Sequence, residues 1–199
     1  LPATTAEAST TSLTHPPARA TLTIHLHWCE YVKVWTGGIL FVFKILYTIF
    51  MYVINRKSVL WNYLSEEIQD LVTDGEALLI EAPNLKEKIS DYSYLVFPFA
   101  KAYEGFLKKL FLDLGLLKED EYYGDDIRIG RILNPNYIHE LTSVYKKIHP
   151  HKNGDDIAER LWNTWRKGRN QVFHYFPHNF RKLSYEEALD VIKDLISAM

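Results

Sequence analysis

The chain has 199 residues, of which 47% are hydrophobic and 14% aromatic, which excludes a disordered protein and allows one domain with a full core, or one domain plus part of another. The formal net charge is −2, and the single cysteine, Cys29, excludes an internal disulfide. A reducing, cytoplasmic compartment is therefore the expected location. Because the sequence begins with Leu1, we expect a fragment or processed product of a longer chain.

The N-terminal part predicts a linker followed by a small amount of β-structure. Residues 1–20 are rich in Ala, Thr, Ser and Pro, which is typical of a flexible tail. Polar and apolar residues alternate from 21 to 28, which predicts a half-buried strand, and residues 31–36 form a candidate second strand. Two strands alone are marginally stable, so we interpret them as the remnant of a preceding α+β domain. No metal site is predicted.

The most apolar stretch covers residues 39–54, and taken from residue 34 it is long enough to span a bilayer. Lys44 at its centre, and Lys33 and Arg56 at its ends, favour a buried helix instead, so a membrane span is not expected. We therefore assign residues 21–54 to a strand pair and an apolar helix that lead into the next domain.

Residues 55–199 predict a helical domain, so the expected fold class is mainly α, a helical bundle preceded by a short two-stranded β segment. Apolar spacings of three and four predict helices at 58–72, 76–82, 90–117, 137–148, 155–174 and 184–199. Asp74 and Gly75 are expected to end the first helix, and Pro98 to kink the third or mark its true start. Residues 118–136 read as a charged loop. Ser184 and Glu187 form a capping box for the last helix.

Two of these helices carry clear apolar stripes. In the third helix the stripe is expected to end at Leu114, and in the fifth it is expected to begin at Ile157, with Asp155 as the cap. The remaining members of the two stripes are Phe99, Tyr103, Phe106, Leu107, Leu110 and Phe111, and then Leu161, Trp165, Gly168 and Val172.

The end of the 155–174 helix carries the strongest candidate for chemistry. Arg169 is suited to holding a phosphate, and His174 to transferring a proton near neutral pH. Asn170 and His174 share a face away from the stripe, whereas Arg169 lies at the edge of the stripe. A site that uses both therefore needs bending at the helix end or a second subunit. We expect the aromatic residues Trp165, Phe173 and Tyr175 to pack around the pair. A basic helix end that contains an Arg and a His by chance is the alternative.

The charge distribution fits an anionic ligand. Residues 64–126 contain fifteen acidic and six basic side chains, whereas residues 137–183 contain nine basic and four acidic side chains. A basic segment around the Arg/His pair suits RNA, although ordinary charge fluctuation also produces such asymmetry. Arg128, Arg131 and Arg166 are candidate RNA contacts, with solvated arginines as the alternative. The acidic residues between 119 and 126 are a candidate docking surface for a basic partner.

Arg169, Asn170 and His174, at the end of a late amphipathic helix in a helical domain, resemble the HEPN superfamily, whose ribonucleases carry an Arg-x4–6-His motif. Residues 55–199 are most similar to the C-terminal HEPN domain of the RnlA/LsoA toxins, which cleave messenger RNA in toxin–antitoxin systems. The resemblance implies an endoribonuclease without cofactor or metal, a 2′,3′-cyclic phosphate product, a homodimer whose motif helices face each other, and an antitoxin as inhibitor.

Those toxins also use an Arg-x-x-Glu pair on an earlier helix, and the corresponding residues here are Lys101 and Glu104. The resemblance implies that Glu104 orients His174 or shares its proton transfer, and that Lys101 adds positive charge. Lys101, Glu104 and Lys108 share one helix face, where a solvated ion pair is the alternative. A lysine does not grip a phosphate bidentately, so Lys101 departs from the pattern of the family.

Cleavage of RNA needs a base for the 2′-hydroxyl, a cation for the phosphorane and an acid for the leaving oxygen. We expect His174 to act as general acid or base and Arg169 to hold the phosphate, with Asn170 fixing a neighbouring group. Two other functions stay open from the sequence. One is a non-catalytic HEPN module that binds RNA, nucleotide or a partner protein, and the other is a membrane-associated effector that uses residues 34–54.

Overall fold

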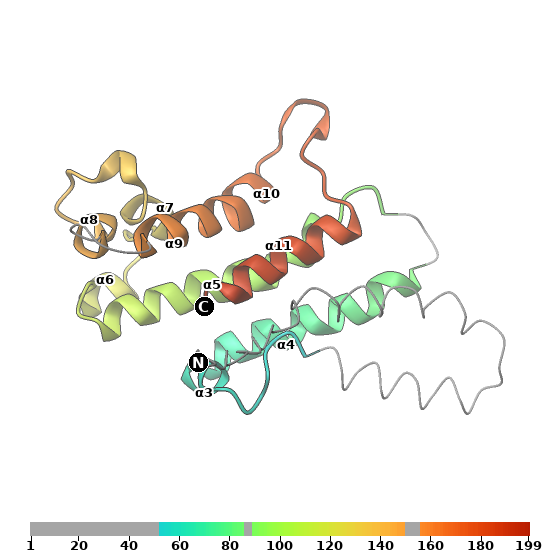
Figure 1. Ribbon diagram of the computed structural model, residues 1–199, viewed down its shortest axis with the longest axis horizontal. Helices are drawn as coiled ribbons and strands as arrows, with labels where there is room; N and C mark the ends of the chain where they lie inside the picture. The colour runs from blue at the N-terminus through green and yellow to red at the C-terminus, as the bar shows by residue number, and fades with distance from the viewer. Residues whose placement is uncertain (1–51, 86–88, 150–155) are drawn as a thin grey trace, which may run out of the picture. The chain divides into compact units, whose positions relative to one another are not determined.

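The structure, a computed structural model, describes residues 52–85, 89–149 and 156–199 (Figure 1). The regular structure within these ranges is helical and contains no strand, which confirms the predicted mainly α class. The predicted tail, the two predicted strands and residues 37–51 of the apolar segment lie outside the described residues. None of the described helices has the length and apolar character needed to cross a membrane.

Two helices replace the predicted pair at 58–72 and 76–82. Helix α3 (Val59–Tyr63) begins where the Ser58 side chain accepts the Trp61 N–H, and α4 (Glu66–Glu81) follows after a short break. The predicted end at Asp74 and Gly75 is wrong, because α4 continues through both residues. Gly75 is buried there against Phe99, and a Cβ atom would lie 2.6 Å from that ring. The glycine therefore serves close helix packing and not termination.

Helix α5 (Ser93–Asp113) is preceded by a 3-10 turn, η1 (Ala82–Asn84), and is the element on which the others pack. Pro98 is its sixth residue, so it does not mark the start of the helix. The predicted stripe is buried or half-buried except for Leu114, which is 61% exposed. The stripe prediction is wrong there because α5 ends at Asp113, and Gly115, with a φ of 65°, turns the chain.

The segment between α5 and the motif helix is built of short pieces. They are α6 (Glu119–Tyr123), α7 (Ile129–Ile132), η2 (Pro135–Tyr137) and α8 (Val144–Ile148). The predicted loop at 118–136 thus contains two short helices. The predicted helix at 137–148 is wrong in its first half, because α8 begins only after Ser143, whose side chain caps it.

The motif helix is continuous but not uniform. It comprises α9 (Ile157–Trp165), a π-helical turn η3 (Arg166–Asn170) and α10 (Gln171–Phe173). Asp156, one residue later than predicted, caps α9 by accepting the Glu159 N–H. The predicted burial of Ile157 is wrong, since it is 53% exposed in the first turn, where Ala158 is buried instead.

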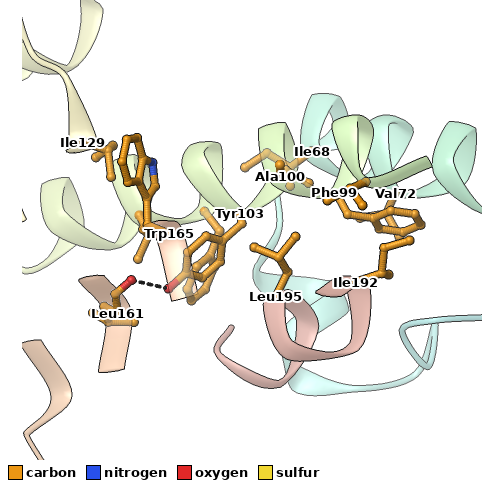
Figure 2. Close-up of a cluster of buried hydrophobic side chains, with 14 of the residues drawn as sticks. Ile68, Val72, Phe99, Ala100, Tyr103, Ile129, Leu161, Trp165, Ile192 and Leu195 are labelled. Carbon is orange, nitrogen blue, oxygen red and sulfur yellow. Dashed lines mark hydrogen bonds between the residues drawn. The ribbon is translucent and has the colours of Figure 1, made fainter. Parts of the chain in front are cut away.

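A loop with one 3-10 turn, η4 (Pro177–Asn179), leads to α11 (Tyr185–Ser197), whose Ser184/Glu187 capping box is confirmed. Figure 2 shows how the core joins these helices: Val72 of α4, Phe99 of α5 and Ile192 of α11 lie together. The Tyr103 hydroxyl donates to the Leu161 carbonyl at 3.3 Å, which ties α5 to α9. Burial raises the pKa of Tyr103, so its hydroxyl stays neutral and available as this donor.

Candidate functional site

A cavity of about 470 Å³ lies where α4, α5 and the motif helix meet. Helix α4 contributes Leu71 to its wall, and the motif helix contributes Arg169 and Phe173. Helix α5 supplies the remaining lining residues, which are Phe97, Ala100, Lys101, Glu104, Gly105 and Lys108. The cavity therefore brings together the two segments that the sequence marked separately.

The α5 wall follows directly from helical spacing. Phe97, Lys101, Glu104 and Lys108 are separated by four, three and four residues, which places them on one face. The opposite face carries buried residues such as Tyr103, so the charged face is left for the cavity and solvent. With Arg169 from the other wall, three cationic side chains surround one carboxylate, which favours an anionic ligand.

Arg169 and Glu104 form the one ion pair that crosses this cavity among the described residues. The Arg169 Nε donates to Glu104 Oε2 at 3.3 Å, and the two side chains are 44% and 29% exposed. The guanidinium also lies 5.8 Å from the ring of Trp165. Because the pair engages only Nε, the two terminal nitrogens of Arg169 keep their donors for another group. Glu104 thus holds the arginine and leaves both terminal nitrogens of its guanidinium free to bind a ligand.

The π-helical turn lies directly at Arg169. The Gln171 N–H bonds to the Arg166 carbonyl, five residues back, so one extra residue is fitted into this turn. Gly168 makes the turn compatible with the core, since a Cβ atom there would lie 2.6 Å from Leu195 Cδ2 of α11. Such π-turns are frequent at functional sites, because they redirect side chains within a helix.

His174 lies outside the cavity. It follows the last helical residue, with extended dihedral angles of φ −92° and ψ 132°, and its side chain is exposed. Phe173, just before it, does line the cavity and meets Phe97 edge to face, with ring centroids 5.7 Å apart. No hydrogen bond or ion pair joins His174 to Arg169 or Glu104 in the described part of the chain. One chain thus supplies the arginine and the carboxylate together, with the histidine outside the cavity.

The other predicted site residues divide between the cavity and its surroundings. Lys101 lines the cavity, and Asn170 is half-buried at the end of the π-turn. Arg166 is half-buried, with Nη2 3.4 Å from Asn163 Oδ1 and with Nε enclosed without a hydrogen-bond partner. Arg166 is therefore only partly accessible to solvent, and its role as an RNA contact stays a prediction.

Arg128 and Arg131 lie next to and on α7, and neither lines the cavity. Arg131 makes a two-point ion pair with Glu140, at 3.0 and 2.8 Å, whereas Arg128 is exposed. Tyr175, which was expected to pack around the motif, is 79% exposed. No group of three or more His, Cys, Asp or Glu side chains within the described ranges is arranged to hold a metal ion.

Two features of the site were not predicted from the sequence. Phe97 was missed because it lies outside the buried stripe of α5, although its spacing of four from Lys101 places it on the charged face. The π-turn was missed because residues 166–170 read as ordinary helix, in which Gly168 and Asn170 were the only departures from good helix formers.

Fold and site together define a helical domain with a cation-rich cavity built around one arginine–carboxylate pair. Residues 51–175 match the family model of the RnlA toxin, described as "RNase LS, bacterial toxin DBD domain". The match covers more than half of the chain and includes Glu104, Arg169 and His174, and the chain belongs to this family. No match was found among curated proteins or among solved structures. The predicted relation to RnlA-type toxins is thereby confirmed, whereas the HEPN assignment stays a prediction.

Proposed function

We propose that this chain is the ribonuclease domain of a toxin, of the HEPN type, that cleaves RNA without a metal ion. The observation that carries the proposal is the Arg169–Glu104 pair in a cavity lined also by Lys101 and Lys108. Membership of a family described as a bacterial RNase LS toxin supports the same activity. The proposed location is the cytoplasm, where messenger RNA is available.

In the proposed reaction Arg169 binds the scissile phosphate through its two terminal nitrogens. Glu104 acts as the positioning residue, since it holds Nε and fixes the direction of the fork. This role replaces the expected contact of Glu104 with His174. Lys101 and Lys108 add positive charge, which stabilises the phosphorane as negative charge develops on its oxygens.

His174 acts as general acid or base in the proposed reaction, and a second chain completes the site. A single chain leaves His174 outside the cavity, so a partner chain that places its own motif helix opposite would bring a histidine to each phosphate. Asn170 lies at the end of the π-turn. Its proposed role is to hold a neighbouring group in place through its amide. An antitoxin that covers the basic surface is the proposed inhibitor.

Cleavage of RNA in the presence of EDTA tests the proposal. We expect the parent to leave 2′,3′-cyclic phosphate ends, and Arg169→Ala and His174→Ala each to lower the rate by about a hundredfold or more. Glu104→Gln should lower it by about tenfold, because a neutral amide holds the guanidinium less firmly. Arg160→Ala, which removes an exposed arginine from the same helix, is the matched control and should leave the rate unchanged.

The outcome separates an enzyme from a binding module. If the folded parent binds RNA but does not cleave it under any of these conditions, the proposal fails and a non-catalytic RNA-binding function replaces it. Unchanged rates in both Arg169→Ala and His174→Ala, with the fold intact by circular dichroism, would show that the chemistry lies elsewhere.

A further inference from the structure

The loop between α10 and α11 combines aromatic and basic residues directly after His174. Residues 174–182 include Tyr175, Phe176, Phe180, Arg181 and Lys182, and this stretch contains no acidic residue. In Figure 1 the loop extends away from the ends of the two helices that it joins. Its composition thus departs from that of an ordinary polar connection.

Two aromatic side chains of this loop are exposed to an unusual degree. Tyr175 is 79% exposed and Phe180, five positions further along the chain, is 65% exposed. Phe176 and Phe180 have ring centroids 5.4 Å apart, and the Arg181 guanidinium lies 4.0 Å from the Phe176 ring. The loop therefore presents flat aromatic and guanidinium surfaces next to positive charge.

The loop is held in place by Asp91, which precedes α5. One carboxylate oxygen of Asp91 accepts the Leu183 N–H at 3.1 Å, and the other accepts the Asn179 amide at 2.9 Å. Burial raises the pKa of Asp91, but the hydrogen bonds from Ser93, Asn179 and Leu183 outweigh it and hold the pKa below its usual range. The Tyr92 N–H also donates to the Leu183 carbonyl at 2.9 Å.

The backbone of the loop is also held in one unusual conformation. His178 and Asn179 both have positive φ values, of 59° and 49°, a conformation that most side chains avoid. A loop kept in this conformation by a multiply bonded carboxylate presents its aromatic residues without a large ordering cost on binding.

We propose that residues 174–182 form a binding surface for single-stranded RNA, in which Tyr175 and Phe180 stack on bases and Arg181 and Lys182 contact phosphates. Stacking on aromatic rings beside a basic groove is the usual mode of single-strand recognition, and it is sequence-tolerant because every base has a flat face. The positive charge of this loop favours a nucleic acid over an uncharged apolar partner. The inference rests on the proposed function for the identity of the ligand, and it places the bound strand beside His174.

Binding can be measured separately from cleavage with a labelled single-stranded oligonucleotide that carries 2′-O-methyl riboses, which lack the attacking hydroxyl. The Kd is measured by fluorescence anisotropy. The double variant Tyr175→Ala/Phe180→Ala should have a Kd about fivefold to a hundredfold higher than that of the parent. Tyr175→Phe should retain the affinity, because the ring is kept. Tyr123→Ala, which removes an 80% exposed tyrosine from α6, is the matched control and should have no effect.

Two further probes separate contacts to the bases from contacts to the phosphates. An oligonucleotide of equal length that lacks bases should bind the parent and the double variant equally. Arg181→Gln should reduce the slope of log Kd against log salt by about one. Equal weakening by Tyr123→Ala, or an unchanged Kd in the double variant, would overturn the inference while cleavage by the parent still supported the proposed function. If the parent does not cleave RNA but base-dependent binding is lost in the double variant, the surface is supported and the enzyme is refuted. A parent that binds no RNA would refute both.

Discussion

Replacing Gly168 by alanine should loosen the helix that carries Arg169. The new Cβ would lie 2.6 Å from Leu195 Cδ2 and 2.8 Å from Cγ, well inside ordinary van der Waals contact. Leu195 is fully buried, so its side chain has no solvent-filled space into which to move. The substitution must therefore shift α11 away from the π-turn.

Two opposing contributions set the size of the effect. Overpacking of a filled core costs about 1–3 kcal/mol, whereas alanine in place of a helical glycine gains about 1 kcal/mol. We expect a net loss of up to about 2 kcal/mol in the free energy of unfolding. For a chain of this size a loss of about 2 kcal/mol corresponds to a decrease in Tm of roughly 4–8 °C.

Thermal melting followed by circular dichroism measures this change, and a double-mutant cycle assigns it. In a Leu195→Ala background the space is open, so Gly168→Ala should become neutral or stabilising. Gly105→Ala is the control, because its Cβ would meet only the Ile68 side-chain end, at 3.2 Å. If Gly168→Ala raised Tm in the parent, or cost as much in the Leu195→Ala background, the packing argument would be refuted.

Two further predictions concern the helix ends. Ile157→Ser should change the free energy of unfolding by no more than about 0.5 kcal/mol, because Ile157 is mostly exposed. Leu161→Ala, at a buried position, should cost about 2–5 kcal/mol. Equal midpoints of urea unfolding for the two variants would contradict this prediction. Asp91 has a folded pKa below that of an unfolded aspartate, so its stabilisation is complete above the ordinary value and is lost as pH falls through the folded one. Asp91→Asn should therefore reduce the dependence of the free energy of unfolding on pH at acid pH. A curve parallel to that of the parent would show that the Asp91 carboxylate does not stabilise the fold in this way.

The helices with strong local signals were predictable from the sequence. The Ser184/Glu187 box and the stripe from Phe99 to Phe111 were recognised because a cap and an apolar spacing act within a single element. Gly75 was misread because the same residue that breaks a helix in isolation also permits close packing. Only the position of Phe99 on another helix decides between the two.

The candidate site shows the same division. The shared face of Lys101 and Glu104 follows from helical spacing, and the Arg/His pair was visible as a motif. The meeting of Arg169 with Lys101 and Glu104 in one cavity depends on the packing of α4, α5 and the motif helix, which no local pattern encodes. Tyr175 was expected to pack around the Arg/His pair, whereas the helix ends before it and leaves it in solvent.

The π-turn has a consequence for which changes in chain length this helix can accommodate. A π-turn closes its hydrogen bond over five residues where an α-turn closes it over four, so the extra residue is absorbed within the turn. Deleting one residue between 166 and 170 would therefore restore regular geometry, while Phe173 would keep its contact with Phe97 and α10 its place against α5. Only the side chains within the turn, that of Arg169 among them, would change direction, so a chain shortened here would keep its core and lose the placement of the arginine.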